Sequence, residues 1–296
     1  MAKPTIANVA ELAGVSQATV SRALRGATNV TEETRIKVQR AADQLNFTLS
    51  KSASALASGK TMRVILLVSG KLNEWFNSGV LQGVYEELAP VGYDVTPAFI
   101  TDRSELDRFF SQLPKSRNAD AIIISSFQLM PAMRDQLQAI DLPTVGVNVP
   151  AESGYFDASI SIDNSSAMTM AVRLLRSLGH TNIAFCSDYI PADMVYNTSQ
   201  RTQAFADAAQ ANATDGITFS LLTADAHDAP LSKSDLASQL TAKLLSLPER
   251  PTAVCVETDQ VAIALVKELR KQQLNVPEDI SVLGFDDAEI AQAADL

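Results

Sequence analysis

Apolar residues recur at helical spacing in three short runs within the first 46 residues. The first run predicts a helix over residues 6–13, which Gly14 ends because glycine readily adopts the left-handed conformation of a turn. Ser16 precedes a second predicted helix over residues 17–24 and can cap its first turn. A third predicted helix begins after Thr31. The inward-facing positions of the three helices are Ile6, Val9, Ala10 and Ala13, then Val20 and Leu24, then Val38, Ala41, Ala42 and Leu45.

The first two predicted helices are separated by a short turn that contains a glycine, which is typical of a helix-turn-helix unit. In such a unit the second helix enters the major groove of DNA and its outer face contacts the bases. That face carries Gln17, Ala18, Ser21 and Arg22. The alternative is an ordinary helical pair in which Arg22 and Arg25 are solvated surface charges.

From Arg63 onward, apolar runs of strand length alternate with helical segments. The predicted strands are RVILLVS, YDVTPAFI, AIIISS, PTVGVNV, SISID, NIAFCS, GITFSLL, PTAVCVE and ISVLGFD. The predicted helices cover residues 79–89, 104–113, 131–140, 165–178, 199–212, 234–247 and 259–272. This alternation predicts two doubly wound α/β lobes, each a parallel sheet with helices on both faces. Small ligands bind such folds in clefts at the carboxyl ends of the strands.

Charge divides the chain where the pattern changes. Residues 1–60 carry eight Lys or Arg and four Asp or Glu, a local net charge of +4, whereas the whole chain carries −10. The remaining residues therefore carry −14. A basic amino-terminal module joined to an acidic body indicates phosphate binding by the module and a different role for the body.

Few residues suit catalysis or metal binding. Cys186 and Cys255 lie in apolar runs, where a buried thiol is the simplest interpretation, and His180 and His227 are far apart. No G-x-x-x-x-G-K-[ST] loop and no G-x-S-x-G motif occurs. We therefore expect no enzymatic activity, no metal and no cofactor. The chain shows no export signal and no apolar run of membrane-spanning length, so we expect a cytoplasmic protein with no membrane partner.

Two other classes of protein fit the α/β body. A solute-binding protein without DNA activity is opposed by the basic headpiece and by the missing export signal. A doubly wound enzyme with a fused headpiece, such as a sugar kinase, is opposed by the missing motifs, and ligand-dependent turnover would favour it.

Five strings, in order along the chain, resemble the lactose-repressor (LacI/GalR) family of bacterial transcriptional regulators: TIANVAELAGVSQATVSRALRG, VTEETRIKVQRAADQLNF, LASGKT, SLGHTNIAF and VPEDISVLGFDD. The resemblance covers essentially the whole chain. It implies a helix-turn-helix DNA-binding domain over residues 1–46, a hinge over 47–61 and a ligand-binding domain over 62–296. That domain would be periplasmic-binding-protein-like, with an N-lobe over about 62–162 and a C-lobe over about 163–296. It also implies a homodimer or dimer-based tetramer on pseudo-palindromic operator DNA, with a small-molecule effector as the switch.

The resemblance implies that Gln17 and Ala18 contact base edges, with Arg22 behind them. Glutamine can bond adenine, arginine can bond guanine, and alanine can touch the methyl group of thymine. The further expected DNA contacts, mostly to phosphates, are Thr5, Ser16, Thr19, Ser21, Asn29 and Thr34. Asn29 can alternatively contact a base.

In the hinge, Leu56 matches a leucine that the family inserts into the minor groove to kink the operator. Ser50 and Ala53 are expected beside it on a hinge helix. The alternative is an ordinary linker residue. The sequence departs from the family at residues 47–50, which read Phe-Thr-Leu-Ser instead of Tyr-x-Pro-Asn, and at Ser54, which replaces an arginine.

The effector-binding residues implied by the resemblance are Asn73, Trp75, Phe76, Asn148, Arg201, Asp259 and Asp286. An aromatic ring at Trp75 or Phe76 would stack on the ligand, Arg201 would fork onto ligand oxygens, and the two aspartates would anchor hydroxyls or amines. Alternatively, Asp259 is a helix N-terminal acid and Asp286 a turn residue. These side chains suit a sugar or a sugar derivative, and a purine is the other candidate.

Family members usually continue past the GFDD string with a strand that returns to the first lobe and a terminal helix. This chain ends at Leu296, so the resemblance implies a truncated carboxyl terminus that affects dimerisation and ligand closure. Taken together, the residues and the resemblance predict a sequence-specific transcriptional repressor controlled by a small molecule, a sugar above all, bound between two lobes.

Overall fold

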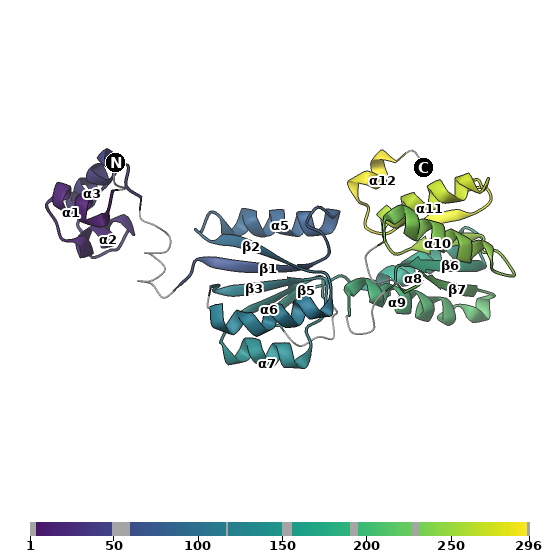
Figure 1. Ribbon diagram of the computed structural model, residues 1–296. Helices are drawn as coiled ribbons and strands as arrows, with labels where there is room; N and C mark the ends of the chain where they lie inside the picture. The colour runs from purple at the N-terminus through teal and green to yellow at the C-terminus, as the bar shows by residue number, and fades with distance from the viewer. Residues whose placement is uncertain are drawn as a thin grey trace. The chain divides into compact units, whose positions relative to one another are not determined.

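The computed structural model describes residues 4–48, 60–116, 118–149, 156–189, 195–226 and 231–294. Internal contacts divide the chain into two units. One is a headpiece unit, Met1–Arg63 with Asn118–Asp120, and the other is a body, Val64–Arg117 with Ala121–Leu296 (Figure 1). Each unit is described by itself below.

Three helices pack around one small core in the headpiece. They are α1 (Ile6–Ala13), α2 (Gln17–Leu24) and α3 (Glu32–Gln44). Gly14 ends α1 at φ 67°, and the hydroxyl of Ser16 accepts a hydrogen bond from the backbone N–H of Thr19 at 3.2 Å. One valine from each helix is fully buried, namely Val9, Val20 and Val38. The first two helices therefore span the residues predicted from apolar spacing and capping.

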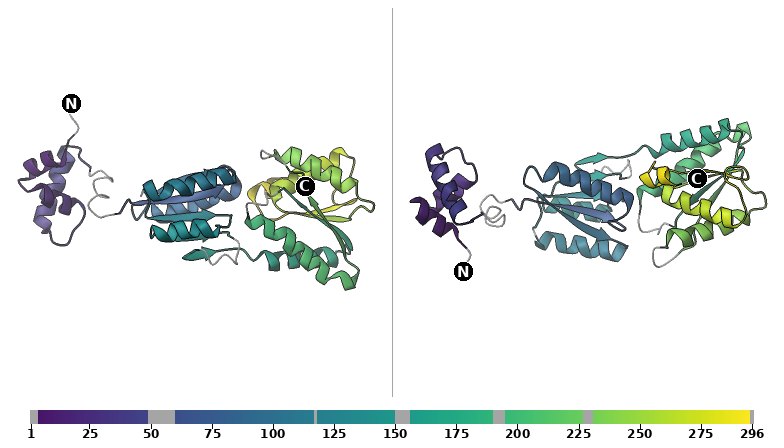
Figure 2. Two further views of the ribbon diagram at one scale, coloured as in Figure 1. Left: turned by 60° about the horizontal axis from the view of Figure 1, so that its bottom comes forward. Right: turned by 90° about the horizontal axis from the view of Figure 1, so that it is seen from above.

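The first half of the body is a five-stranded sheet with helices on both faces (Figure 2). Its elements are β1 (Arg63–Ser69), α5 (Trp75–Leu88), β2 (Asp94–Ile100), α6 (Arg103–Ser116), β3 (Ala121–Ser125), α7 (Pro131–Ala139), β4 (Thr144–Val147) and β5 (Ala158–Ile160). The strand order is β2-β1-β3-β4-β5, and β1, β3, β4 and β5 pair in parallel. We call this half the N-lobe.

The second half of the body, the C-lobe, is a four-stranded parallel sheet in the order β7-β6-β8-β9. Its elements are α8 (Asn164–Ser177), β6 (Asn182–Ser187), α9 (Asn197–Ala211), a 3-10 turn (Ala213–Asp215), β7 (Thr218–Thr223), α10 (Lys233–Leu245), β8 (Ala253–Val256), α11 (Asp259–Lys271), β9 (Ser281–Leu283) and α12 (Glu289–Ala293). The helical headpiece and these parallel sheets confirm the predicted fold class.

Both faces of β6 and β8 are buried, which explains why these strands are continuously apolar. One face packs against α10 and α11 and includes Cys186, while the other packs against α8 and α9 and includes Cys255. Burial raises the pKa of both thiols. The two cysteines are therefore core residues on opposite faces of one sheet, as their apolar surroundings predicted.

Three elements differ from the sequence-based expectation. The predicted SISID strand begins one residue earlier and is shorter, as β5 at the edge of the first sheet. Helix α5 begins at Trp75 rather than at residue 79. The prediction missed its first turn because an exposed tryptophan, a half-buried phenylalanine and a buried asparagine there disguise the helical period. The short helix α12 was not predicted, and its five residues include no buried apolar residue that could produce a periodic signal.

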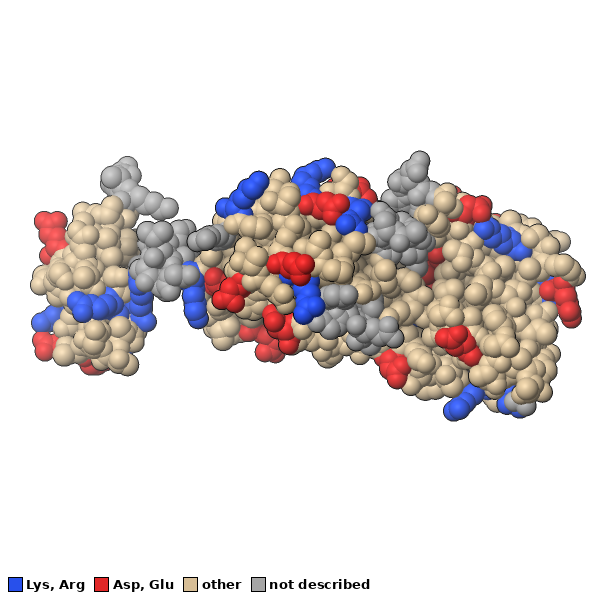
Figure 3. All heavy atoms as spheres, turned by 90° about the horizontal axis from the view of Figure 1, so that it is seen from below, with Lys and Arg blue, Asp and Glu red and all other residues tan. Residues whose placement is uncertain are grey.

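Acidic and basic side chains are interspersed over the face of the body that Figure 3 shows. The acidic excess of the body therefore does not gather into a single patch on that face. None of the helices in the described ranges is long and apolar enough to cross a membrane.

Candidate functional site

The outer face of α2 presents polar side chains that the headpiece fold does not need. Gln17, Ala18 and Arg22 are exposed, whereas Val20 and Ala23 on the other face are buried. The Nε of Arg22 donates to the carbonyl oxygen of Ala18 at 3.2 Å, which keeps the guanidinium along the same face. The predicted base-contacting residues therefore lie together on one exposed helix face.

Several of the predicted phosphate contacts are hydroxyl residues at helix starts. Ser16 and Thr19 share a hydroxyl hydrogen bond of 2.9 Å, and Thr31 and Thr34 share one of 2.8 Å. The Thr5 hydroxyl donates to Asn8 at 2.7 Å. Helix starts present free backbone N–H groups, so phosphate oxygens are favoured there. The remaining members of the predicted set, Ser21 and Asn29, are half-buried and exposed respectively, and Ser50, Ala53 and Leu56 lie outside the described residues.

A cavity of about 300 Å³ lies where the carboxyl ends of the strands of the two lobes meet. The N-lobe contributes the ends of β1, β3 and β4 and the first turn of α5. The C-lobe contributes the ends of β6 and β8, the loop after β9 and the first turn of α9. This is the position at which doubly wound folds bind small molecules.

Aromatic rings form part of the N-lobe side of the cavity. Trp75 is 41% exposed, and its ring lies 6.1 Å from that of Phe76 at an interplanar angle of 52°. The turn that carries them is fixed by Asn77, a buried residue whose amide donates to the carbonyl oxygens of Ser69 and Lys71 at 2.8 and 3.0 Å. Asn73 is exposed and does not line the cavity. Asn77, and not the predicted Asn73, therefore holds this turn in place.

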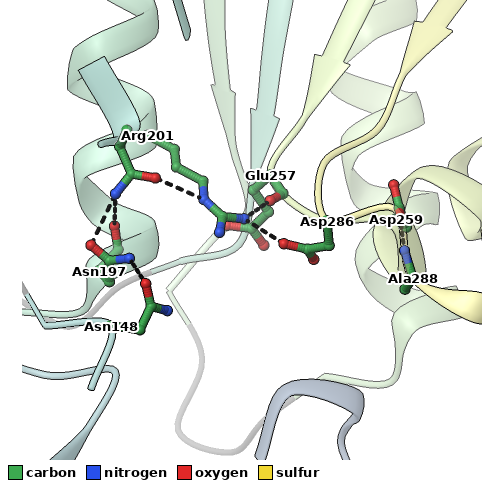
Figure 4. A network of polar contacts seen from close by, with 8 residues as sticks. Asn148, Asn197, Arg201, Glu257, Asp259, Asp286 and Ala288 are labelled. Carbon is green, nitrogen blue, oxygen red and sulfur yellow. Dashed lines mark hydrogen bonds and ion pairs between the residues drawn. The ribbon is translucent and has the colours of Figure 1, made fainter. Parts of the chain in front are cut away.

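Arg201 is the central charged group of the C-lobe side and is only 3% exposed (Figure 4). Its guanidinium donates to the backbone carbonyl of Glu257, lies 3.3 Å from an oxygen of Asp286 and stacks 3.7 Å from the centre of the Phe285 ring. Its Nε donates to Asn164 at 3.3 Å. Burial lowers the pKa of Arg201, opposed by the nearby acids Asp286 and Glu257.

A chain of buried amides connects Arg201 to the N-lobe. Asn164, which accepts from Arg201, donates to the side-chain oxygen of Asn197 at 2.9 Å. Asn197 in turn donates to the side-chain oxygen of Asn148 at the end of β4, in the other lobe. Figure 4 shows the contacts from Arg201 through Asn197 to Asn148. A ligand that displaces the Arg201 side chain would therefore affect the hydrogen bond between Asn197 and Asn148, which joins the two lobes.

Two acids that line the cavity have raised pKa values. Burial raises the pKa of Glu257 to about 7, and a hydrogen bond from the backbone N–H of Asp188 opposes the shift. Burial raises the pKa of Asp286 to about 6, and Arg201 opposes that shift. Asp286 and Asn148 also have positive φ angles of 110° and 53°, a conformation that is costly for residues other than glycine and is concentrated at functional sites.

Asp259 lies outside the cavity lining. Its carboxylate accepts from the backbone N–H of Ala288 at 2.8 Å, and its own N–H donates to the carbonyl of Phe285 at 2.9 Å. A side chain at Gly284 would collide with this carboxylate. Asp259 therefore fixes the loop that carries Asp286. It is the first residue of α11, which is the alternative to ligand contact that the sequence left open for it.

The structure brings five of the predicted effector-binding residues to one cavity: Trp75, Phe76, Asn148, Arg201 and Asp286. Sequence reasoning missed Glu257, Asn164 and Asn197. A signal for Glu257 exists, because it is a lone acid at the end of the otherwise apolar PTAVCVE strand. The two asparagines lie at helix starts and carry no distinctive signal in one sequence.

The headpiece and the two-lobed body define a class of protein in which a DNA-binding unit is joined to a small-molecule-binding unit. Residues 5–50 match the bacterial regulatory proteins of the lacI family, and residues 172–296 match the periplasmic binding protein-like domain. The HTH-type transcriptional repressor PurR of Vibrio cholerae serotype O1 is 31% identical over 291 residues, covering 97% of this chain and 83% of the relative. This chain belongs to the lacI family of transcriptional regulators.

Solved structures agree with the fold. The lac repressor dimer bound to operator and the anti-inducer ONPF has a TM-score of 0.79 at 23% identity, covering 97% of this chain and 84% of that chain. The complex of the transcriptional regulator CelR with cellobiose has a TM-score of 0.63 at 26% identity, covering 98% and 85%. The chain is a DNA-binding transcriptional regulator, and its relatives are regulators rather than enzymes.

Proposed function

We propose that this regulator is a homodimeric repressor whose affinity for a pseudo-palindromic operator changes when a sugar or sugar derivative binds the cavity between its lobes. The observation that carries the proposal is the Arg201 network. A buried guanidinium lines the cavity and is connected through Asn164 and Asn197 to Asn148 in the opposite lobe.

The cavity lining supports a polyhydroxylated ligand. Carboxylate, amide and guanidinium groups can bond hydroxyls, while the rings of Trp75 and Phe76 offer an apolar face for stacking. The related regulator CelR binds cellobiose. A ligand that contacts both lobes binds one lobe arrangement better than another, and this difference in affinity is what allows it to act on the headpieces.

On DNA, the exposed face of α2 supports reading of bases by Gln17, Ala18 and Arg22. A dimer presents two such helices to half-sites about 34–36 Å apart along the duplex. A ligand that changes the relative orientation of the lobes, and with it this spacing, would weaken binding to one of the half-sites. The family's hinge leucine corresponds to Leu56.

Selection of bound sequences from a random DNA pool tests the DNA side, at fixed salt because phosphate contacts make affinity strongly salt-dependent. We expect enrichment of a palindromic site. No enrichment from a chain that is dimeric in solution would contradict the proposal.

The ligand side has a built-in reporter, because Trp75 is the only tryptophan of the chain and lines the cavity. A panel of mono- and disaccharides, with cellobiose included, is titrated while tryptophan fluorescence is recorded, and responding sugars are then added to the operator complex. We expect a responding sugar to change operator affinity. A sugar that quenches Trp75 without changing operator affinity would favour a solute-binding role.

A further inference from the structure

Acidic groups outnumber basic ones around the cavity. The charged residues that line it are Glu74, Asp188, Glu257 and Asp286 on the acidic side and Arg201 and Lys233 on the basic side. Arg201 and Asp286 form an ion pair within the lining, with 3.3 Å between the guanidinium and a carboxylate oxygen. The lining therefore holds four acids and two bases, an excess of negative charge.

Glu257 is the most deeply placed of these acids. It follows β8 directly, is 5% exposed and lines the cavity. Its Oε1 accepts from the backbone N–H of Asp188 at 3.0 Å. A buried carboxylate is costly unless a cation or several donors compensate its charge.

The charges of Arg201 and Lys233 offset this cost only in part. The guanidinium contacts the backbone carbonyl of Glu257 rather than its carboxylate, and its other contacts are Asp286, Asn164 and the Phe285 ring. Lys233, at the start of α10, is exposed, and its charge lowers the pKa of Glu257 without offsetting the effect of burial. The pKa of Glu257 is raised to about 7, because burial outweighs the hydrogen bond from Asp188 and the charges of Lys233 and Arg201.

We propose that Glu257 binds a protonated amine of the effector, so that the cavity selects amino-substituted sugars or polyols over their neutral and acidic counterparts. This inference rests on the proposed function, because it specifies the ligand of the same cavity. A charge-assisted N–H···O bond is roughly twice as strong as a neutral one, and it would add a cation beside a buried acid whose charge the chain compensates only in part. A carboxylate or phosphate on the ligand would instead meet Glu74, Asp188 and Glu257.

The test compares matched ligands that differ in one group. The probes are the 2-amino sugars, the parent 2-hydroxy sugars and the uronic acids of the gluco, galacto and manno series, titrated by calorimetry and by tryptophan fluorescence. We expect one amino sugar to bind at least about tenfold more tightly than its parent, the size expected of a charged hydrogen bond. We expect the uronic acids to bind more weakly than the parents.

Glu257→Gln keeps the shape and removes the charge, so it should bring the amino sugar to within about twofold of its parent. Glu249→Gln is the matched control, since Glu249 is an exposed acid of the same lobe that does not line the cavity. It should retain the full preference. Thermal unfolding of both variants separates loss of binding from loss of folding.

An amine preference that survives in Glu257→Gln overturns the inference, as does a uronic acid that binds as well as its parent. Absence of binding by every amino sugar also overturns it. These failures are distinct from failure of the proposed function, which is measured by operator selection and by the response of operator binding to neutral sugars.

Discussion

The α2 face and the cavity use polar side chains in opposite ways. In the headpiece, Gln17 and Arg22 are exposed while separate apolar residues hold the three helices together. In the cavity, the polar groups are themselves buried, with Arg201 at 3% and Glu257 at 5% exposure. A substitution on α2 should therefore change function alone, whereas a substitution in the cavity should change both ligand binding and stability.

Arg201→Ala should show the largest combined effect. It leaves Asp286 half-enclosed without its cation and breaks the bond to Asn164, and removing one partner of a buried pair typically costs about 3–5 kcal/mol of unfolding free energy. Urea unfolding measures the loss, and fluorescence titration should show lost sugar affinity. Arg173→Ala, at an exposed position of α8, is the control. Unchanged ligand affinity in the Arg201 variant would remove this residue from the site.

Glu257→Gln should stabilise the ligand-free protein at alkaline pH. The folded-state pKa is raised to about 7 from the usual 4.5, so the folded protein holds this proton more tightly than the unfolded chain does. Stability from this group is complete below about pH 4.5 and is lost as the pH rises to about 7, a change on the order of 3 kcal/mol.

The glutamine variant cannot lose a proton, so its unfolding free energy should exceed that of the parent at pH 8 by up to this amount. Urea unfolding at pH 5 and pH 8 measures the difference, with Glu249→Gln as the control. Equal stability of parent and variant at pH 8 would show that Glu257 is solvated well enough to keep its charge without cost.

The contrast between the two regions also explains what could be predicted from sequence. The headpiece depends on local signals, since Gly14, Ser16 and the spacing of Val20 and Leu24 act within a few residues. The cavity is assembled from strand ends that are far apart in sequence, so Trp75, Arg201 and Asp286 were located by family resemblance rather than by pattern. Placement of Asp259 outside the lining depends on a contact with Ala288, which no local pattern contains.

Arg22→Ala should weaken operator binding without destabilising the protein. An arginine that bonds a guanine contributes about 1–3 kcal/mol of discrimination, so selective binding should fall by roughly 5- to 150-fold. Because Arg22 is exposed, the unfolding free energy should change by less than about 0.5 kcal/mol. Competition between operator and random DNA measures the selectivity, with Trp75 fluorescence confirming intact sugar affinity.

Arg40→Ala is the matched control, because Arg40 is exposed on α3 and its substitution removes the same charge as Arg22→Ala does. This variant should lower the affinities for operator and for random DNA by the same factor, so that selectivity is unchanged. If Arg22→Ala weakened operator and random DNA by the same factor, as a loss of charge alone would, the headpiece would be binding through its net charge rather than through bases contacted by α2.

Ser16→Ala tests a headpiece residue that is expected to contribute both to folding and to DNA binding. Ser16 is a predicted phosphate contact and also caps α2, where its hydroxyl accepts from the Thr19 N–H at 3.2 Å. Loss of an N-cap costs about 1 kcal/mol, which should appear as faster hydrogen–deuterium exchange in peptides that cover α1 to α3. Gln17→Ala, one residue along and exposed, should leave that exchange unchanged while reducing operator selectivity. If both variants exchange at the parental rate, the cap is dispensable and Ser16 acts through DNA alone; if both exchange faster, α2 carries its base-contacting face at a cost in stability, as the cavity does.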